Sequence, residues 1–152
     1  LPIVLGAALC GTKAGAWLGA VFGAVVLLSG DAAPFLTVSV PGTVITVMLK
    51  GILAGLCAGL VYRLVARKNR DLAVVCAAVV CPVVNTGVFL LGCMTFFMDT
   101  ISGWAAAVGL GGDVAHYMIF VMVGVNFLVE LGVNIVLSPI IVRLLNIKRA
   151  SA

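Results

Sequence analysis

Apolar runs alternate along the chain with short polar or glycine-rich segments. The apolar runs cover residues 1–10, 14–29, 43–66, 72–98 and 115–145. A helix that crosses a bilayer needs roughly 20 residues, so the first run spans only about half of one. The pattern predicts one all-α domain over residues 1–152, a polytopic transmembrane helical bundle with five helices. The two longest polar segments contain Asp, Pro or Gly and are predicted to be loops: 30–41 and 99–113.

The composition supports a membrane protein and excludes several functions. The chain is 64% hydrophobic and 9% charged, whereas soluble domains are about one-quarter charged. The net charge of +4 comes from basic residues that are scattered or lie at helix ends, which does not indicate a nucleic-acid partner. The chain has one histidine, its five cysteines lie in apolar runs, and it has no catalytic motif. We therefore expect no enzyme activity, no metal site and no cofactor.

Charge also orients the bundle. Basic residues mark one set of helix ends: Lys13, Arg63–Arg70 and Arg143–Arg149. Acidic residues lie in the loops at the other: Asp31, Asp99 and Asp113. Since cytoplasmic loops carry an excess of Lys and Arg, the basic side is predicted to be cytoplasmic, and the C-terminus with it.

Two stretches place glycine at every fourth position. One consists of Gly15, Gly19 and Gly23, and the other of Gly51, Gly55 and Gly59. Small residues at this spacing allow the backbones of membrane helices to approach closely. The spacing favours either packing within the bundle or a face that docks a partner membrane protein, for which Gly15, Gly19 and Gly23 are the candidates.

Polar residues on three predicted helices lie at similar depths. By helix rise, Lys50 lies about a dozen ångströms from the end of its helix, and Asn85 and Asn126 about 18–20 Å from the same side. With Thr86 beside Asn85, they predict a ligand cavity in the outer half of the membrane, with apolar walls and one cation. Without such a cavity, Lys50 would snorkel or pair with an aspartate, and the asparagines would bond neighbouring helices.

Further candidates lie deeper in the membrane and in the outer loops. Glu130 and Asn134 follow Asn126 at four-residue intervals, on the same helix face. Glu130 is predicted to contact the ligand, to pair with Lys13 or to be protonated. Three residues are predicted to cap the cavity: Trp104, His116 and Tyr117. For Trp104, anchoring at the membrane interface is the alternative.

Much of the chain resembles the substrate-binding S components of energy-coupling factor (ECF) transporters. The second and third helices of that family resemble IVLGAALCGTKAGAWLGAVFGAVV. Its fourth, fifth and sixth helices resemble MLKGILAGLCAGLVYRL, CPVVNTGVFLLG and VNFLVELGVNIVLSPIIVRLL. The resemblance implies a six-helix S-component fold whose first helix is missing before Leu1. It also implies a multi-pass protein of the prokaryotic plasma membrane with a cytoplasmic C-terminus.

The same resemblance implies a function. S components bind a vitamin or related micronutrient with high affinity in an outward-side cavity, for ATP-driven uptake by an ECF-type ABC importer. The implied partners are the vitamin, membrane lipid, a transmembrane coupling subunit and two ATPase subunits. The positions that match are Lys50, Asn85, Thr86 and Asn126, with His116 and Tyr117 at the rim. Lys50 favours an anionic vitamin such as pantothenate or folate.

The alternative is a structural or assembly subunit of the membrane, which docks partners through its glycine-spaced helices. In such a subunit the asparagines only hold helices together, and side chains fill the outer half of the bundle. A secondary transporter is a third option, but it usually contains internal repeats, and the two glycine stretches are too short to count as repeats. The presence or absence of an outer cavity distinguishes the first two hypotheses.

Overall fold

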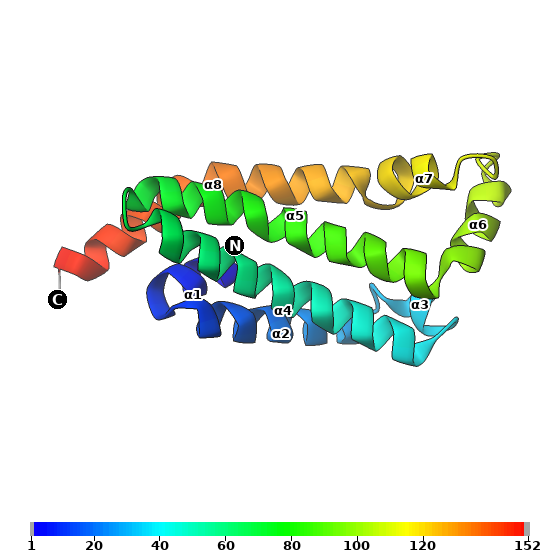
Figure 1. Cartoon of the computed structure of the whole chain (residues 1–152), viewed down its shortest axis with the longest axis horizontal. Coiled ribbons are helices and arrows are strands. Elements are labelled where there is room, and N and C mark those ends of the chain that lie inside the picture. The colour runs from blue at the N-terminus through cyan, green and yellow to red at the C-terminus, as the bar shows by residue number, and fades with distance from the viewer. Residues whose placement is uncertain (1, 151–152) are drawn as a thin grey trace.

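The computed structural model describes residues 2–147 in full and the backbone of residues 148–150. Every regular element in this range is a helix, which confirms the all-α membrane bundle (Figure 1). Four helical segments are long and apolar enough to cross a membrane: α2 (Thr12–Ser29), α4 (Val40–Val65), α5 (Arg70–Phe96) and the run Val114–Ile147. Helix α1 (Pro2–Cys10) has 9 residues and is too short to cross a membrane.

The last of these segments contains three elements: α7 (Val114–His116), the π-helix η1 (Tyr117–Gly124) and α8 (Val125–Ala150). Large apolar side chains cover the outside of the bundle, as the 87% exposed Leu28 and the 72% exposed Val125 illustrate. Water would make such a surface costly, whereas lipid accepts it. The structure therefore supports a multi-pass membrane protein.

The two predicted loops contain short helices, so the prediction of loops was wrong in this respect. The first holds α3 (Ala33–Leu36), which has a proline near its start, and the second holds α6 (Met98–Ala107). In α6, Ile101 and Ala105 are one turn apart and both are buried, so tertiary packing stabilises this helix despite its glycine-rich surroundings. Figure 1 shows α3, α6 and α7 together at the end of the bundle opposite the C-terminus. We call this the acidic end, since Asp31, Asp99 and Asp113 lie there, and the other the basic end.

The two glycine stretches pack against each other. A Cβ atom added at Gly15 would lie 2.6 Å from the carbonyl oxygen of Gly55, and one added at Gly23 would lie 3.0 Å from that of Val47. Between them, Gly19 and Gly51 approach so closely that a Cβ on either would overlap the other's carbonyl oxygen. The stretches therefore pack within the bundle, by the first of the two predicted uses. The docking role predicted for Gly15, Gly19 and Gly23 does not fit this packing, because α4 covers the face that they form.

Small side chains also join α4 to α5 near the basic end. The buried cluster there includes Ala54 and Ala58 of α4 and Ala77 and Ala78 of α5. The amide of Asn134 ties α8 to this pair, since its Nδ2 donates to the carbonyl oxygen of Ala78 at 3.4 Å. For Asn134, hydrogen bonding between helices is thus the observed role.

Candidate functional site

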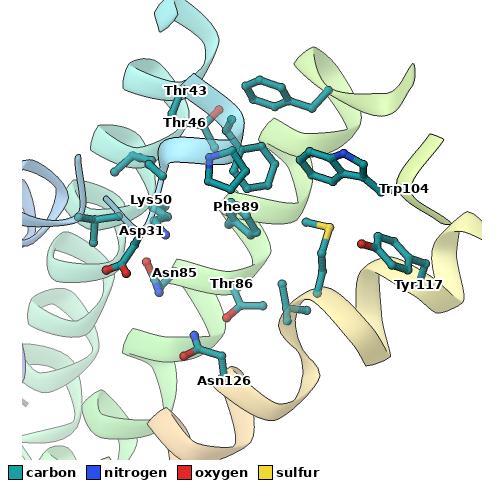
Figure 2. Close-up of a pocket in the computed structure, with 18 residues that line it drawn as sticks. Asp31, Thr43, Thr46, Lys50, Asn85, Thr86, Phe89, Trp104, Tyr117 and Asn126 are labelled. Carbon is teal, nitrogen blue, oxygen red and sulfur yellow. The ribbon is translucent and has the colours of Figure 1, made fainter. Parts of the chain in front are cut away.

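A cavity of about 480 Å³ lies at the acidic end of the bundle. Its walls come from α4, α5, η1 and the start of α8, and α3 and α6 close it from the acidic end (Figure 2). Ligand pockets in proteins usually have volumes of about 300–1,000 Å³ and combine apolar walls with a few polar groups. This cavity has that size, and its lining divides into a polar part and an aromatic part.

The polar part contains the residues that the sequence analysis had grouped by their predicted depth in the membrane. Lys50 of α4, Asn85 and Thr86 of α5 and Asn126 of α8 all line the cavity. The Nζ atom of Lys50 lies 4.8 Å from the centre of the Phe89 ring, a distance at which an aromatic face attracts a cation. Among residues 2–147, Lys50 forms no ion pair. Its ammonium therefore lines the cavity with no described carboxylate at ion-pair distance, although Asp31 shares the lining.

Asp31 also lines the cavity but is engaged elsewhere. The hydroxyl of Ser29 donates to Oδ2 of Asp31 at 2.7 Å, just beyond the glycine that ends α2. This contact holds the carboxylate near the rim, at the turn between α2 and α3. Pairing of Lys50 with Asp31, one alternative for the lysine, is thus not the contact that the structure contains.

Two buried polar atoms of the cavity lining have no partner. Asn85 is 7% exposed; its Nδ2 donates to Oε2 of Glu130 at 3.5 Å, while its Oδ1 accepts no hydrogen bond. Thr46, 3% exposed, likewise has an Oγ1 without a partner. A buried polar group left unpaired costs about 1–3 kcal/mol. Both residues line the cavity, but the two atoms are shielded from solvent in the empty protein, so a polar ligand would reach them through a small shift of the side chains.

The aromatic part is built around Phe35 of α3. Its ring packs edge-on against Phe89 (centroids 5.6 Å apart), Phe97 (5.2 Å) and Trp104 (5.5 Å). Such edge-to-face pairs are each worth about 0.5–1.5 kcal/mol beyond their buried area. Trp104 therefore forms part of the cavity, as Figure 2 shows, and its role goes beyond an interfacial anchor. The cluster fixes α3 and α6 over the polar part.

The π-helix supplies the remaining wall. Tyr117, Met122 and Val123 of η1 line the cavity. The wider i→i+5 turn of a π-helix is rare and often occurs at functional sites. Glycine fits closely at its end, since a Cβ on Gly124 would lie 2.8 Å from the carbonyl oxygen of Ile119, five residues earlier, and would make the local backbone shift. One side of η1 therefore borders the cavity, while Ile119, Phe120 and Val121 are exposed on the outside of the bundle.

Two predicted site residues lie outside the cavity lining. His116 is exposed and stacks on Phe120 with ring centroids 4.6 Å apart. Glu130 reaches the cavity only through Asn85 and lines a neighbouring space of about 280 Å³. The sequence analysis missed other lining residues, since aromatic and threonine side chains within apolar runs carry no signal: Phe35, Thr43, Thr46, Phe89 and Phe97.

In the part of the chain that the structure describes, no three His, Cys, Asp or Glu side chains come close enough to hold an ion. The buried thiols of Cys81 and Cys93 lie in separate apolar clusters, as expected of small hydrophobic side chains. The lining of the cavity itself offers one cation, the Asp31 carboxylate, amides, hydroxyls and aromatic rings.

Comparison with known proteins gives one positive result. A family profile described as "ECF transporter, substrate-specific component" matches residues 1–142. No curated protein and no solved structure matches the chain. The profile spans the helices that form the cavity and the glycine packing.

Proposed function

Because the chain belongs to the family of substrate-specific components of ECF transporters, we propose that it captures a vitamin or related micronutrient with high affinity in the cavity at its acidic end. Membership makes it a transporter subunit for a small molecule, which associates with coupling and ATPase subunits. The vitamin, the affinity and the use of ATP for import are what we propose beyond that.

The observation that carries the proposal is the cavity with its unpaired polar lining. A structural subunit would fill this space with side chains, as the glycine side of α4 is filled by α2. Here the chain leaves about 480 Å³ open and leaves Asn85 Oδ1 and Thr46 Oγ1 without partners. Both features lower the stability of the empty protein. A bound molecule that meets these atoms would offset the cost.

The lining suggests the chemistry of the bound molecule. Lys50 offers a positive charge for a carboxylate or another anionic group. Asn85 presents an acceptor oxygen, so the molecule should carry an N–H or O–H donor nearby. The aromatic part suits an apolar or planar portion. An anionic vitamin with amide or hydroxyl groups, such as pantothenate or folate, meets these requirements.

The charge pattern supports import as the direction of transport. The positive-inside rule favours a cytoplasmic basic end. The cavity then lies in the outer half of the prokaryotic plasma membrane, with α3 and α6 between it and the outside, and the C-terminus lies in the cytoplasm. The coupling subunit and two ATPases would supply the energy for import, since the sequence of this chain contains no ATP-binding motif.

Thermal unfolding of the purified protein in detergent, without ATP, tests the proposal against a panel of vitamins. One vitamin rather than several should raise the unfolding temperature by mass action. Lys50→Ala and Asn126→Ala should weaken that shift and slow uptake in cells that express the whole transporter. Lys68→Ala is the matched control, because Lys68 lies in the turn at the basic end and lines no part of the cavity.

The proposal fails if no vitamin stabilises the protein and both cavity variants take up substrate at the wild-type rate. The alternative, a structural subunit without a substrate, predicts that outcome together with stable co-purifying partners. The open cavity and the coverage of Gly15, Gly19 and Gly23 by α4 both count against it.

A further inference from the structure

A second cavity, of about 730 Å³, lies at the basic end of the bundle, far from the first. It is bounded by the turn between α1 and α2, the last turns of α4 and the start of α5. Four basic side chains line it, and no carboxylate does: Lys13, Arg63, Arg67 and Arg70. Among residues 2–147, none of the four forms an ion pair. The cavity is thus a concave surface of one charge sign.

The packing of α2 on α4 determines where these charges meet. A Cβ added at Gly59 would lie 2.7 Å from Cα of Thr12, so the first turn of α2 rests directly on α4. Tyr62 and Arg63 follow Gly59 by three and four residues and therefore lie on the same face, one turn beyond this contact. The guanidinium of Arg63 and the ammonium of Lys13 consequently border one space from two helices.

The start of α2 adds unpaired donors to the same space. Its N-cap is Gly11, with φ of 91° and no side chain to cap the helix. The first backbone bond of the helix runs from the Gly15 amide to the Gly11 carbonyl oxygen at 3.1 Å. The amides of residues 12–14 therefore have no partner inside the helix, and the positive end of its dipole faces the cavity. By contrast, the Asn69 side chain caps the start of α5.

The location decides which anion is within reach. α4 ends at Val65 and α5 begins at Arg70, so the cavity lies where two membrane-crossing helices leave the lipid. Phospholipid head groups lie at that level, and basic pockets between helices are suited to anionic ones. We infer that this cavity binds the head-group phosphate of an anionic phospholipid, a site separate from the vitamin cavity and independent of the proposed function.

A simpler role for the four charges would be to set the orientation of the chain and nothing else. Topology depends on the number of basic residues near the helix ends and not on a shared cavity. Lys68 and Arg143 provide the comparison, since both lie at the same end and neither lines the cavity. If the cavity is a binding site, lipid binding should depend on Arg63 and Arg67 and not on Lys68 and Arg143. If the charges only set the topology, all four of these residues should be equivalent.

The test uses the protein in nanodiscs of equal phosphatidylcholine and phosphatidylglycerol, with retained lipid counted by native mass spectrometry. The wild type should retain phosphatidylglycerol in preference to phosphatidylcholine. Each basic residue near an anionic head group changes binding about fivefold, so Arg63→Gln with Arg67→Gln should lower retention of phosphatidylglycerol roughly thirtyfold. The control, Lys68→Gln with Arg143→Gln, removes the same charge and should retain lipid as the wild type does.

Two results would overturn the inference. Equal retention of both lipids by the wild type would show that the cavity does not select an anionic head group. Equal loss in the two double variants would show that charge alone matters. Inorganic phosphate, added to wild-type protein in neutral detergent, provides a measurement without mutation. If millimolar phosphate raises the unfolding temperature while phosphatidylglycerol shows no preference, the site takes free phosphate and the assignment to lipid is wrong.

Discussion

The helix α4 packs in opposite ways on its two sides. Toward α2 it presents Gly51 and Gly55, and backbone touches backbone. Toward α5 and η1, at the acidic end, it presents Thr46 and Lys50, and about 480 Å³ stays open. In lipid, helices associate through close packing and hydrogen bonds, because no hydrophobic force drives them together. The comparison teaches that the glycine side holds the bundle together, while the other side can give up packing for a binding site.

The largest expected effect comes from filling the glycine side. Gly51→Leu would force α2 and α4 apart, since even a Cβ at this position overlaps the carbonyl oxygen of Gly19. We expect a loss of about 3 kcal/mol or more in the free energy of unfolding. The unfolding temperature and the monodisperse fraction in detergent would report it.

Gly132→Ala is the control for that substitution. Gly132 lies inside α8 and has no atom within 4 Å of an added Cβ. Alanine should therefore stabilise the helix by about 0.5–1 kcal/mol. If Gly51→Leu unfolds at the same temperature as the wild type, the contact between α2 and α4 does not hold the bundle together.

On the cavity side, an aromatic truncation should weaken binding. Trp104→Ala removes a ring from the wall next to Phe35, and anchors of this kind are worth about 2 kcal/mol, or roughly a thirtyfold change in Kd. Calorimetry with the vitamin that stabilises the wild type most would measure it. Trp17→Ala is the matched control, because Trp17 is 70% exposed and lies at the basic end. Equal effects of the two would contradict the position assigned to the aromatic part.

A smaller effect is expected from Thr46→Val, which should change the stability of the empty protein and the affinity for ligand in opposite directions. Thr46→Val keeps the shape of the side chain and removes the buried, unpaired Oγ1. The empty protein should gain about 1 kcal/mol of stability, since an unsatisfied polar group is replaced by an apolar one. Binding should weaken, because the ligand can no longer form a hydrogen bond with the Thr46 hydroxyl. Unfolding temperatures with and without vitamin test both signs, and destabilisation of the empty protein would contradict the role assigned to Thr46.

The smallest expected effect is at His116. Its ring stacks on Phe120 outside the cavity, so His116→Ala should change the free energy of binding by less than about 0.5 kcal/mol. Tyr117→Ala, one residue later, should weaken binding, since Tyr117 lines the wall. Measured Kd values for the two variants give the comparison. A large loss in His116→Ala would place the rim farther out than the structure does.

The sequence predicted the bundle because long apolar runs permit few other folds. It also predicted that Lys50, Asn85, Thr86 and Asn126 share one cavity, since helix rise converts sequence position into depth. It did not predict α3 or α6, because short helices depend on tertiary contacts such as those of Ile101.

Other features had no local signal. No pattern of residue types marks the π-helical turn of η1 in the sequence. The turn also changes which residues share one face of the helix. Residues one position apart differ by about 100° around a helix, which explains how Tyr117 reaches the cavity while His116 does not. Phe35 was missed because an apolar ring in an apolar segment gives no sign of its partners.

The glycine contact between α2 and α4 has a consequence for how such a chain can change over generations. Positions whose backbones touch, such as Gly19 and Gly51, accept no other residue without a shift of a whole helix. Positions around the open space, such as Thr46 and Thr86, accept exchanges that alter only what fits there. Mutation can therefore change which substrate fits while the packing of the bundle stays the same. The two sides of α4 therefore differ in how freely the residues that contact them can be exchanged.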